Sequence, residues 1–129
     1  MKESPIMKRI LLDCGHGDTR LFRANVGQAW AGVAIRQPNG VDVLVKNAYP
    51  VKFGHKGMSD LIGWRSVLVT EAMLGRKLAV YTAIEAKSTT GRPSDDQRVF
   101  IDLVLAAGGM AGVAKSVDDA QEILNQVNT

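Results

Sequence analysis

The chain has 129 residues, of which 46% are hydrophobic and 22% charged, as is ordinary for one globular domain. No apolar run approaches the roughly 20 residues that cross a bilayer, and the first residues lack the apolar core of a secretory signal, so we expect a cytoplasmic protein. The net charge is +3, and Cys14 is the only cysteine, which excludes an internal disulfide and a thiolate zinc site. The two histidines, His16 and His55, stand in no metal-ligand spacing, and we expect both in loops or on the surface.

The charge is unevenly distributed along the chain. Between Arg20 and Arg98 there are twelve Lys and Arg against six Asp and Glu, whereas from Val99 onward one Lys stands against four acids. A basic middle segment suits a polyphosphate partner, because phosphate neutralisation supplies most nonspecific nucleic-acid affinity. On charge alone, a mixed solvated surface is the competing interpretation.

The first residues predict a helix. Ser4 followed by Pro5 is typical of a helix start, with serine as the cap and proline in the first turn. Ile6 and Ile10 then give an apolar stripe at helical spacing. We expect this helix to stop near residues 15–17, where two glycines occur.

The next segment predicts strands and turns. Residues 20–27 favour a strand, and residues 28–32 favour an irregular segment. Residues 37–40, Gln-Pro-Asn-Gly, are a turn signal, and residues 41–49 favour a short strand in an insertion. Residues 54–57 form a glycine-punctuated loop.

Two longer strands follow in the middle of the chain. Residues 60–70 form the first, with a bend at residues 65–66 as one option, and residues 77–87, dense in β-formers, form the second. Gly75 suits a turn between them, so a hairpin is the expected connection.

The last third of the chain predicts a helix, a strand and a helix. Ser94 and Gln97 have the spacing of a capping box, and the helix that they open ends at residues 108–109. Residues 110–115 form a short strand, and Ser116 caps the last helix. The order of helix, strands, helix, strand and helix predicts an α/β domain with a mixed sheet. The apolar residues of the last helix are Ile123, Leu124 and Val127.

An acid and a base stand at the end of the second predicted strand. Side chains alternate between the faces of a strand, so Glu85 and Lys87 project from the same side. An exposed strand end with a weak ion pair is the alternative interpretation. The predicted hairpin would bring Asp60 beside Glu85, where both carboxylates could share a Mg²⁺ ion. Lys87 would then lie where it could orient or deprotonate an attacking water.

This arrangement resembles the PD-(D/E)xK nuclease signature, with Ser59 in place of the usual proline. The surrounding sequence is similar to the VRR-NUC family, specifically its short stand-alone phage-type members, over nearly the whole chain. The matching segments are Glu3-Ser4, residues 21–27, residues 57–63, residues 85–88, residues 90–94, Gln97, residues 100–101 and residues 107–109.

The resemblance implies a fold and a set of roles. It implies one nuclease domain over residues 1–129, with a restriction-endonuclease-like core in which helices flank a mixed central β-sheet. It makes Asp60 and Glu85 metal ligands for Mg²⁺ or Mn²⁺, with the Ala86 carbonyl as a candidate third ligand. Lys87 is the implied catalytic lysine.

Two further site residues follow from the same resemblance. Gln97 matches the family's glutamine that faces the active site, while the capping box is an equally good interpretation. Glu3 matches a glutamate of the first helix that completes the acidic cluster, although its position at the helix start limits its reach. Asp13 is the alternative for that role, and a solvated acid at the helix end is its simpler identity.

Basic and aromatic residues are candidate contacts for nucleic acid. Trp30 and Trp64 could stack on nucleotides, but we expect both in the core. Plain surface charge competes with each proposed phosphate contact, and the expected contacts are Arg20, Arg23, Lys56 and Arg92.

The leading hypothesis is therefore a metal-dependent, structure-selective DNA endonuclease of a phage or prophage. The resemblance to Holliday-junction resolvases implies branched DNA as substrate and a homodimer, the commonest symmetric assembly. A flap or end-processing nuclease and a noncatalytic DNA-binding protein on a nuclease fold are the alternatives.

Overall fold

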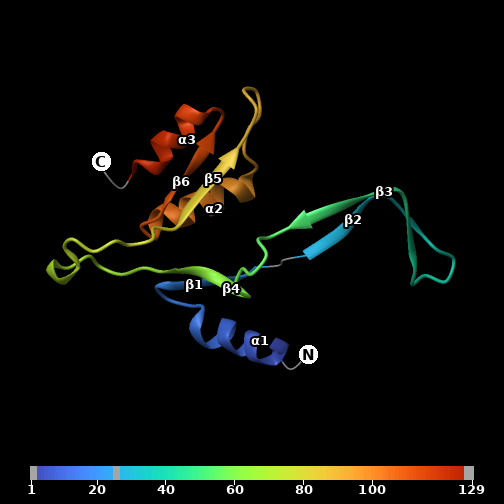
Figure 1. Ribbon diagram of the computed structural model, residues 1–129, viewed down its shortest axis with the longest axis horizontal. Coiled ribbons are helices and arrows are strands. Elements are labelled where there is room, and N and C mark those ends of the chain that lie inside the picture. Colours follow the sequence, from blue (N-terminus) through green and yellow to red (C-terminus); the bar gives the residue numbers. More distant parts are fainter. Residues whose placement is uncertain (1–2, 25–26, 127–129) are drawn as a thin grey trace. The chain divides into compact units, whose positions relative to one another are not determined.

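The computed structural model describes residues 3–24 and 27–126, without the side chains of residues 3, 4 and 53 (Figure 1). The chain forms two compact units. The first contains the residues up to Gly15 and residues 21–62, and the second contains residues 16–20 and the residues from Gly63 onward. Among the described residues, no helix is long and apolar enough to cross a membrane.

The elements confirm the predicted mixed α/β order. Three two-stranded sheets occur within the described ranges. They pair β1 (Thr19–Arg23) with β4 (Leu61–Arg65), β2 (Gly27–Arg36) with β3 (Val43–Phe53), and β5 (Thr82–Ala86) with β6 (Met110–Ala114). The single domain and the restriction-endonuclease-like central sheet stay predictions.

Helix α1 spans Glu3–Cys14. It begins one residue before Ser4, which therefore lies inside the first turn and not at the cap position. The helix ends at Cys14, as predicted. Glycine is required at the next position, because a Cβ at Gly15 would lie 2.6 Å from the Leu11 carbonyl oxygen. The predicted apolar stripe is exposed, with Ile6 at 61%.

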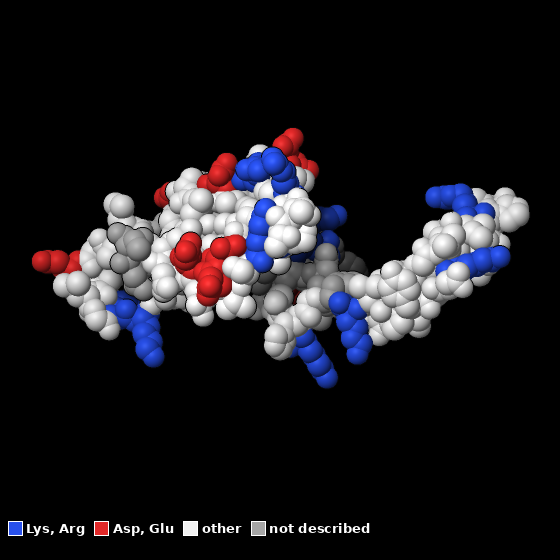
Figure 2. Space-filling view, turned by 90° about the horizontal axis from the view of Figure 1, so that it is seen from above, with Lys and Arg blue, Asp and Glu red and all other residues white. Residues whose placement is uncertain are grey.

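Strands β2 (Gly27–Arg36) and β3 (Val43–Phe53) form a long antiparallel hairpin, here called the arm (Figure 1). The predicted irregular segment at residues 28–32 is wrong for residues 28–31, which pair regularly with residues 49–52. The predicted turn is confirmed, since Gly40 N donates to Gln37 O at 3.0 Å. The face of the arm seen at the right of Figure 2 carries Lys and Arg but no Asp or Glu.

An irregularity interrupts the arm ladder at Gly32. The register shifts between Ala31 and Val33, and Gly32 adopts a φ of 154°. A Cβ at this position would lie 2.6 Å from the Lys46 carbonyl oxygen and 2.9 Å from Val45 Cγ1. Glycine is therefore required where the two strands approach each other most closely.

The predicted core position of Trp30 is wrong. Trp30 lies in β2 with 62% of its surface exposed, because no described element of the first unit covers the two-stranded arm. Trp64, in contrast, is partly buried in the second unit, where its ring centroid lies 4.7 Å from that of Tyr81.

The predicted central hairpin is wrong. Strand β4 (Leu61–Arg65) pairs with β1 (Thr19–Arg23), and β5 (Thr82–Ala86) pairs in parallel with β6 (Met110–Ala114). A 3-10 turn over Glu71–Met73 lies between β4 and β5, and the predicted turn glycine, Gly75, has a φ of 78°. The parallel pair is stable because helices cover β5 and β6 and bury the apolar strand β6.

The core of the second unit surrounds β6. Helices α2 (Asp95–Ala106) and α3 (Val117–Leu124) both pack against the β5–β6 sheet (Figure 1). Both predicted N-caps are confirmed, since Ser94 Oγ accepts from Gln97 N and Ser116 Oγ accepts from Asp119 N. Val127 lies outside the described residues. The fully buried apolar side chains are Val104, Ala111, Ala114 and Ile123.

Candidate active site

The candidate site lies at the end of β5. Parallel pairing sets Glu85 opposite Val113 and Ala86 opposite Ala114. The ladder continues one residue further, because Lys87 N donates to the Ala114 carbonyl oxygen at 3.0 Å. The backbone that carries Glu85 and Lys87 is thus fixed by β6, which belongs to the packed core of the second unit.

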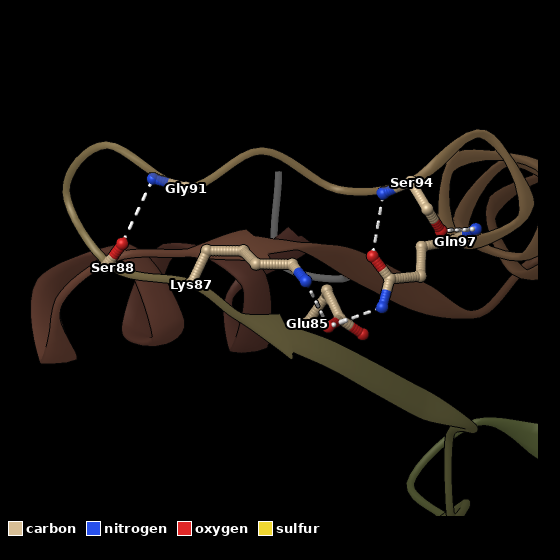
Figure 3. Close-up of polar contacts among 6 residues, drawn as sticks. All are labelled: Glu85, Lys87, Ser88, Gly91, Ser94 and Gln97. Atoms are coloured by element: carbon tan, nitrogen blue, oxygen red, sulfur yellow. Dashed lines mark hydrogen bonds and ion pairs between the residues drawn. The ribbon is translucent and has the colours of Figure 1, made fainter.

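Glu85 and Lys87 lie on the same side of the strand, as the alternation predicts. Lys87 Nζ is 3.3 Å from Glu85 Oε1, and the two side chains are only 25% and 32% exposed (Figure 3). The ion pair of the alternative interpretation is therefore present, but it is partly withdrawn from solvent. A partly buried acid and base at a strand end can bind and polarise a charged ligand more strongly than the same pair in water.

Gln97 connects helix α2 to Glu85. Its Nε2 donates to Glu85 Oε1 at 3.0 Å, while its Oε1 accepts from Ser94 N at 2.8 Å (Figure 3). Because the Ser94 amide requires an acceptor, the capping box fixes which end of the Gln97 amide faces the carboxylate. Gln97 therefore both completes the capping box and contacts Glu85, and the capping box orients its amide for that contact.

Glu85 offers an oxygen for a cation. Oε1 accepts a hydrogen bond from Gln97 and forms the ion pair with Lys87, whereas Oε2 has no hydrogen-bonding partner among the described residues. Glu85 and Gln97 also line a hollow of about 390 Å³ between β5 and α2, together with Asp96 and Phe100. A carboxylate oxygen is a donor that Mg²⁺ prefers, so the donor type fits a hard cation.

The remaining predicted acids belong to a different unit from Glu85. No group of three metal-ligating side chains occurs among the described residues. Asp60 is exposed and belongs to the first unit, whereas Glu85 belongs to the second. Without the predicted hairpin, a cation shared by Asp60 and Glu85 stays a prediction from the family resemblance.

The other two acids lie in α1. Glu3 is its first residue, with a side chain outside the described set. Asp13 is exposed and accepts from Arg9 Nε at 2.7 Å within the same helix.

A tight loop follows Lys87, and sequence reasoning missed the residue that holds it. Gly91 N lies 3.1 Å from both the carbonyl oxygen and Oγ of Ser88, which closes the loop (Figure 3). Lys115 Nζ then donates to the Thr89 carbonyl oxygen at 3.1 Å. Lys115 directly follows β6, and only the parallel pairing of β5 with β6 brings it to this loop.

The predicted phosphate contacts are all exposed, but they belong to different parts of the chain. Arg92 stands in the loop after Lys87, and Arg20 lies in β1; both belong to the second unit. Arg23 and Lys56 belong to the first unit.

Comparison with protein families identifies the chain. The model of the VRR-NUC domain matches residues 41–118, which is more than half of the chain and includes Asp60, Glu85, Lys87 and Gln97. The chain therefore belongs to the VRR-NUC domain family, and its function is of the nuclease type, in DNA processing. No curated protein and no solved structure gave a significant match.

Proposed function

We propose that this protein is a metal-dependent, structure-selective DNA endonuclease that resembles Holliday-junction resolvases. The observation that carries the proposal is the arrangement around Glu85. Its Oε1 is held between Lys87 and Gln97, while Oε2 is free to bind a cation. A glutamate that served only to stabilise the strand end would have no need of a lysine and a glutamine at the same oxygen.

Glu85, Asp60 and the Ala86 carbonyl are the proposed ligands of Mg²⁺ or Mn²⁺. Glu3 is the proposed additional acid. When bound, the cation supplies Lewis-acid activation of the scissile phosphate. Gln97 restrains the Glu85 side chain, so that the free oxygen keeps one direction and the ligand loses little entropy on binding.

Lys87 has two proposed tasks. Before DNA binds, its ammonium group offsets the Glu85 carboxylate at 3.3 Å and keeps the pair folded against the strand. When DNA is present, the same ammonium orients the attacking water and stabilises the negative charge that develops on the phosphate in the transition state. Backbone pairing of Lys87 with Ala114 limits the movement of this group.

The substrate and assembly follow from the family resemblance and from charge. Exposed Arg20, Arg23, Lys56 and Arg92 are proposed to bind phosphates. A homodimer would present two cleavage centres to the paired strands of a four-way junction. The proposed setting is the cytoplasm of a bacterial host that carries the phage or prophage.

The test compares cleavage of labelled four-way junction, 5′-flap, linear duplex and single-stranded DNA. Each is incubated with Mg²⁺, Mn²⁺ or EDTA, with Lys87→Ala beside the unmodified protein and Lys77→Ala as a surface control. We expect paired nicking of the junction that requires metal, falls roughly 10²–10³-fold in Lys87→Ala and is unchanged in Lys77→Ala.

Other outcomes separate the alternatives. Cleavage of flaps or ends in preference to junctions would assign an end-processing nuclease with the same centre. DNA binding in EDTA without cleavage of any substrate would favour the noncatalytic DNA-binding protein and overturn the proposed activity.

A further inference from the structure

The arm formed by β2 and β3 has no partner within its own unit. Its strands have ten and eleven residues, and they pair with each other along almost their whole length. Among the described residues of the first unit, no helix or other strand packs along them. A two-stranded hairpin alone in water is marginally stable, so an arm of this length gains from a binding partner.

The charge of the arm identifies the chemistry of that partner. Residues 27–53 contain Arg36, Lys46 and Lys52 but only one acid, Asp42. Asp42 is held at the turn, where its Oδ2 accepts from Asn39 Nδ2 at 2.7 Å. Lys46 and Lys52 are exposed and make no ion pair with any described residue. The arm therefore presents unpaired positive charge to a polyanion (Figure 2).

The pairing register distributes these charges over both faces. Near the tip, Lys46 lies opposite Val33, whereas Arg36 lies opposite Val43 on the other face. Near the base, Lys52 and Trp30 occupy alternate positions of the ladder and share a face. Trp30 and Tyr49 are 62% and 58% exposed, which adds flat apolar surface between the charges.

We propose that the arm is a DNA-binding ribbon that lies in a groove of duplex DNA. A two-stranded β-ribbon fits the major groove. Positive charge on both faces can reach the phosphates of both strands, while the exposed apolar side chains contact sugars and thymine methyl groups. Ten residues of strand extend about 34 Å, close to one helical turn of DNA.

This inference rests on the proposed function, since it assigns to the same DNA substrate a contact outside the cleavage centre. It adds Arg36, Lys46 and Lys52 to the contacts expected from the sequence. The family model begins at residue 41, so β2 and its Arg36 lie outside the matched segment.

The test measures binding to a fluorescent duplex and to a four-way junction in EDTA, over a range of salt concentrations. A triple variant, Arg36→Gln, Lys46→Gln and Lys52→Gln, is compared with a control that also removes three exposed charges, Lys8→Gln, Arg76→Gln and Lys77→Gln. We expect the triple variant to raise the Kd roughly tenfold or more. Its slope of log K against log salt should be shallower by about 0.9 for each phosphate that the arm no longer neutralises. The control should change neither quantity as much.

Equal affinities and slopes for the two variants would overturn the inference while leaving the proposed nuclease intact. Unmodified protein that binds no DNA would overturn both proposals. Light scattering and circular dichroism on all three proteins complete the test. If the weaker binding of the triple variant coincides with a changed oligomeric state, the arm is an interface between copies and the DNA assignment is wrong.

Discussion

The two compact units hold their strands in different ways. In the second unit, α2 and α3 cover β5 and β6, and the four side chains that are buried among the described residues all belong to this unit. In the first unit, no described residue is buried, and the arm is held mainly by its own backbone ladder. The proposed site residues, Glu85 and Lys87, lie on the packed unit. The arm lies on the unpacked unit, where its strands can change conformation locally at a small cost in free energy.

The largest expected effect comes from a glycine of the packed unit. A Cβ at Gly109 would lie 2.7 Å from Val104 Cγ1 and 2.8 Å from the Tyr81 carbonyl oxygen. Because these atoms belong to the core and to backbone, we expect Gly109→Ala to destabilise the protein by about 3 kcal/mol and to lower the Tm by on the order of 10 °C. Differential scanning calorimetry measures both changes.

Gly32→Ala is the matched variant in the arm, where the clash with the Lys46 carbonyl oxygen is at least as close. We expect the main melting transition to be nearly unchanged, with faster amide hydrogen exchange confined to β2 and β3. An equal loss of Tm in both glycine variants would contradict the proposed difference between the two units, since it would show that the arm melts together with the core.

A smaller effect is expected from a valine in each unit. Val104 is 1% exposed and Val33 is 58% exposed. Val104→Ala leaves a cavity and should cost about 2 kcal/mol of unfolding free energy, whereas Val33→Ala should change it by less than about 0.5 kcal/mol. Urea denaturation of both variants gives the two values. A large loss for Val33→Ala would mean that the exposed face of the arm is covered in solution.

The smallest expected effect concerns the junction of α2 with β5. Gln97→Glu keeps an acceptor for Ser94 N but removes the donor to Glu85 Oε1. Because two carboxylates then face each other, we expect a slightly lower Tm, cleavage that falls roughly tenfold, and a changed Mg²⁺ concentration for half-maximal cleavage. Cleavage and metal dependence like those of the unmodified protein would show that the Gln97–Glu85 bond has no part in the reaction.

Features set by neighbouring residues could be predicted from the sequence. The caps at Ser94 and Ser116 and the end of α1 near Gly15 depend on side chains within four residues of the helix end. The common side of Glu85 and Lys87 follows from strand alternation alone. These predictions needed no knowledge of the rest of the fold.

Features that depend on partner choice could not be predicted in the same way. Residues 60–70 and 77–87 had suitable composition for a hairpin, but β5 pairs with β6, where Thr82 lies opposite Met110. Strand β2, which occupies the segment expected to be irregular, likewise forms by pairing with β3 on the other side of the turn at residues 37–40. A hydrophobic pattern identifies a strand without specifying which strand it pairs with. The contact of Lys115 with the loop after Lys87 depends on such a pairing and could not be predicted. The expected proximity of Asp60 to Glu85 depended on a hairpin that does not form.

The parallel pairing of β5 with β6 has a consequence for how the protein is made. The arm joins strands that are adjacent in the chain, so it can form as soon as residues up to Phe53 have left the ribosome. The Glu85–Lys87 centre requires Ala114 for its backbone and Ile123 for the core behind β6. Folding during synthesis therefore assembles the proposed cleavage centre late. A nascent chain interrupted before this point would carry the basic arm but would lack the strand that pairs with β5.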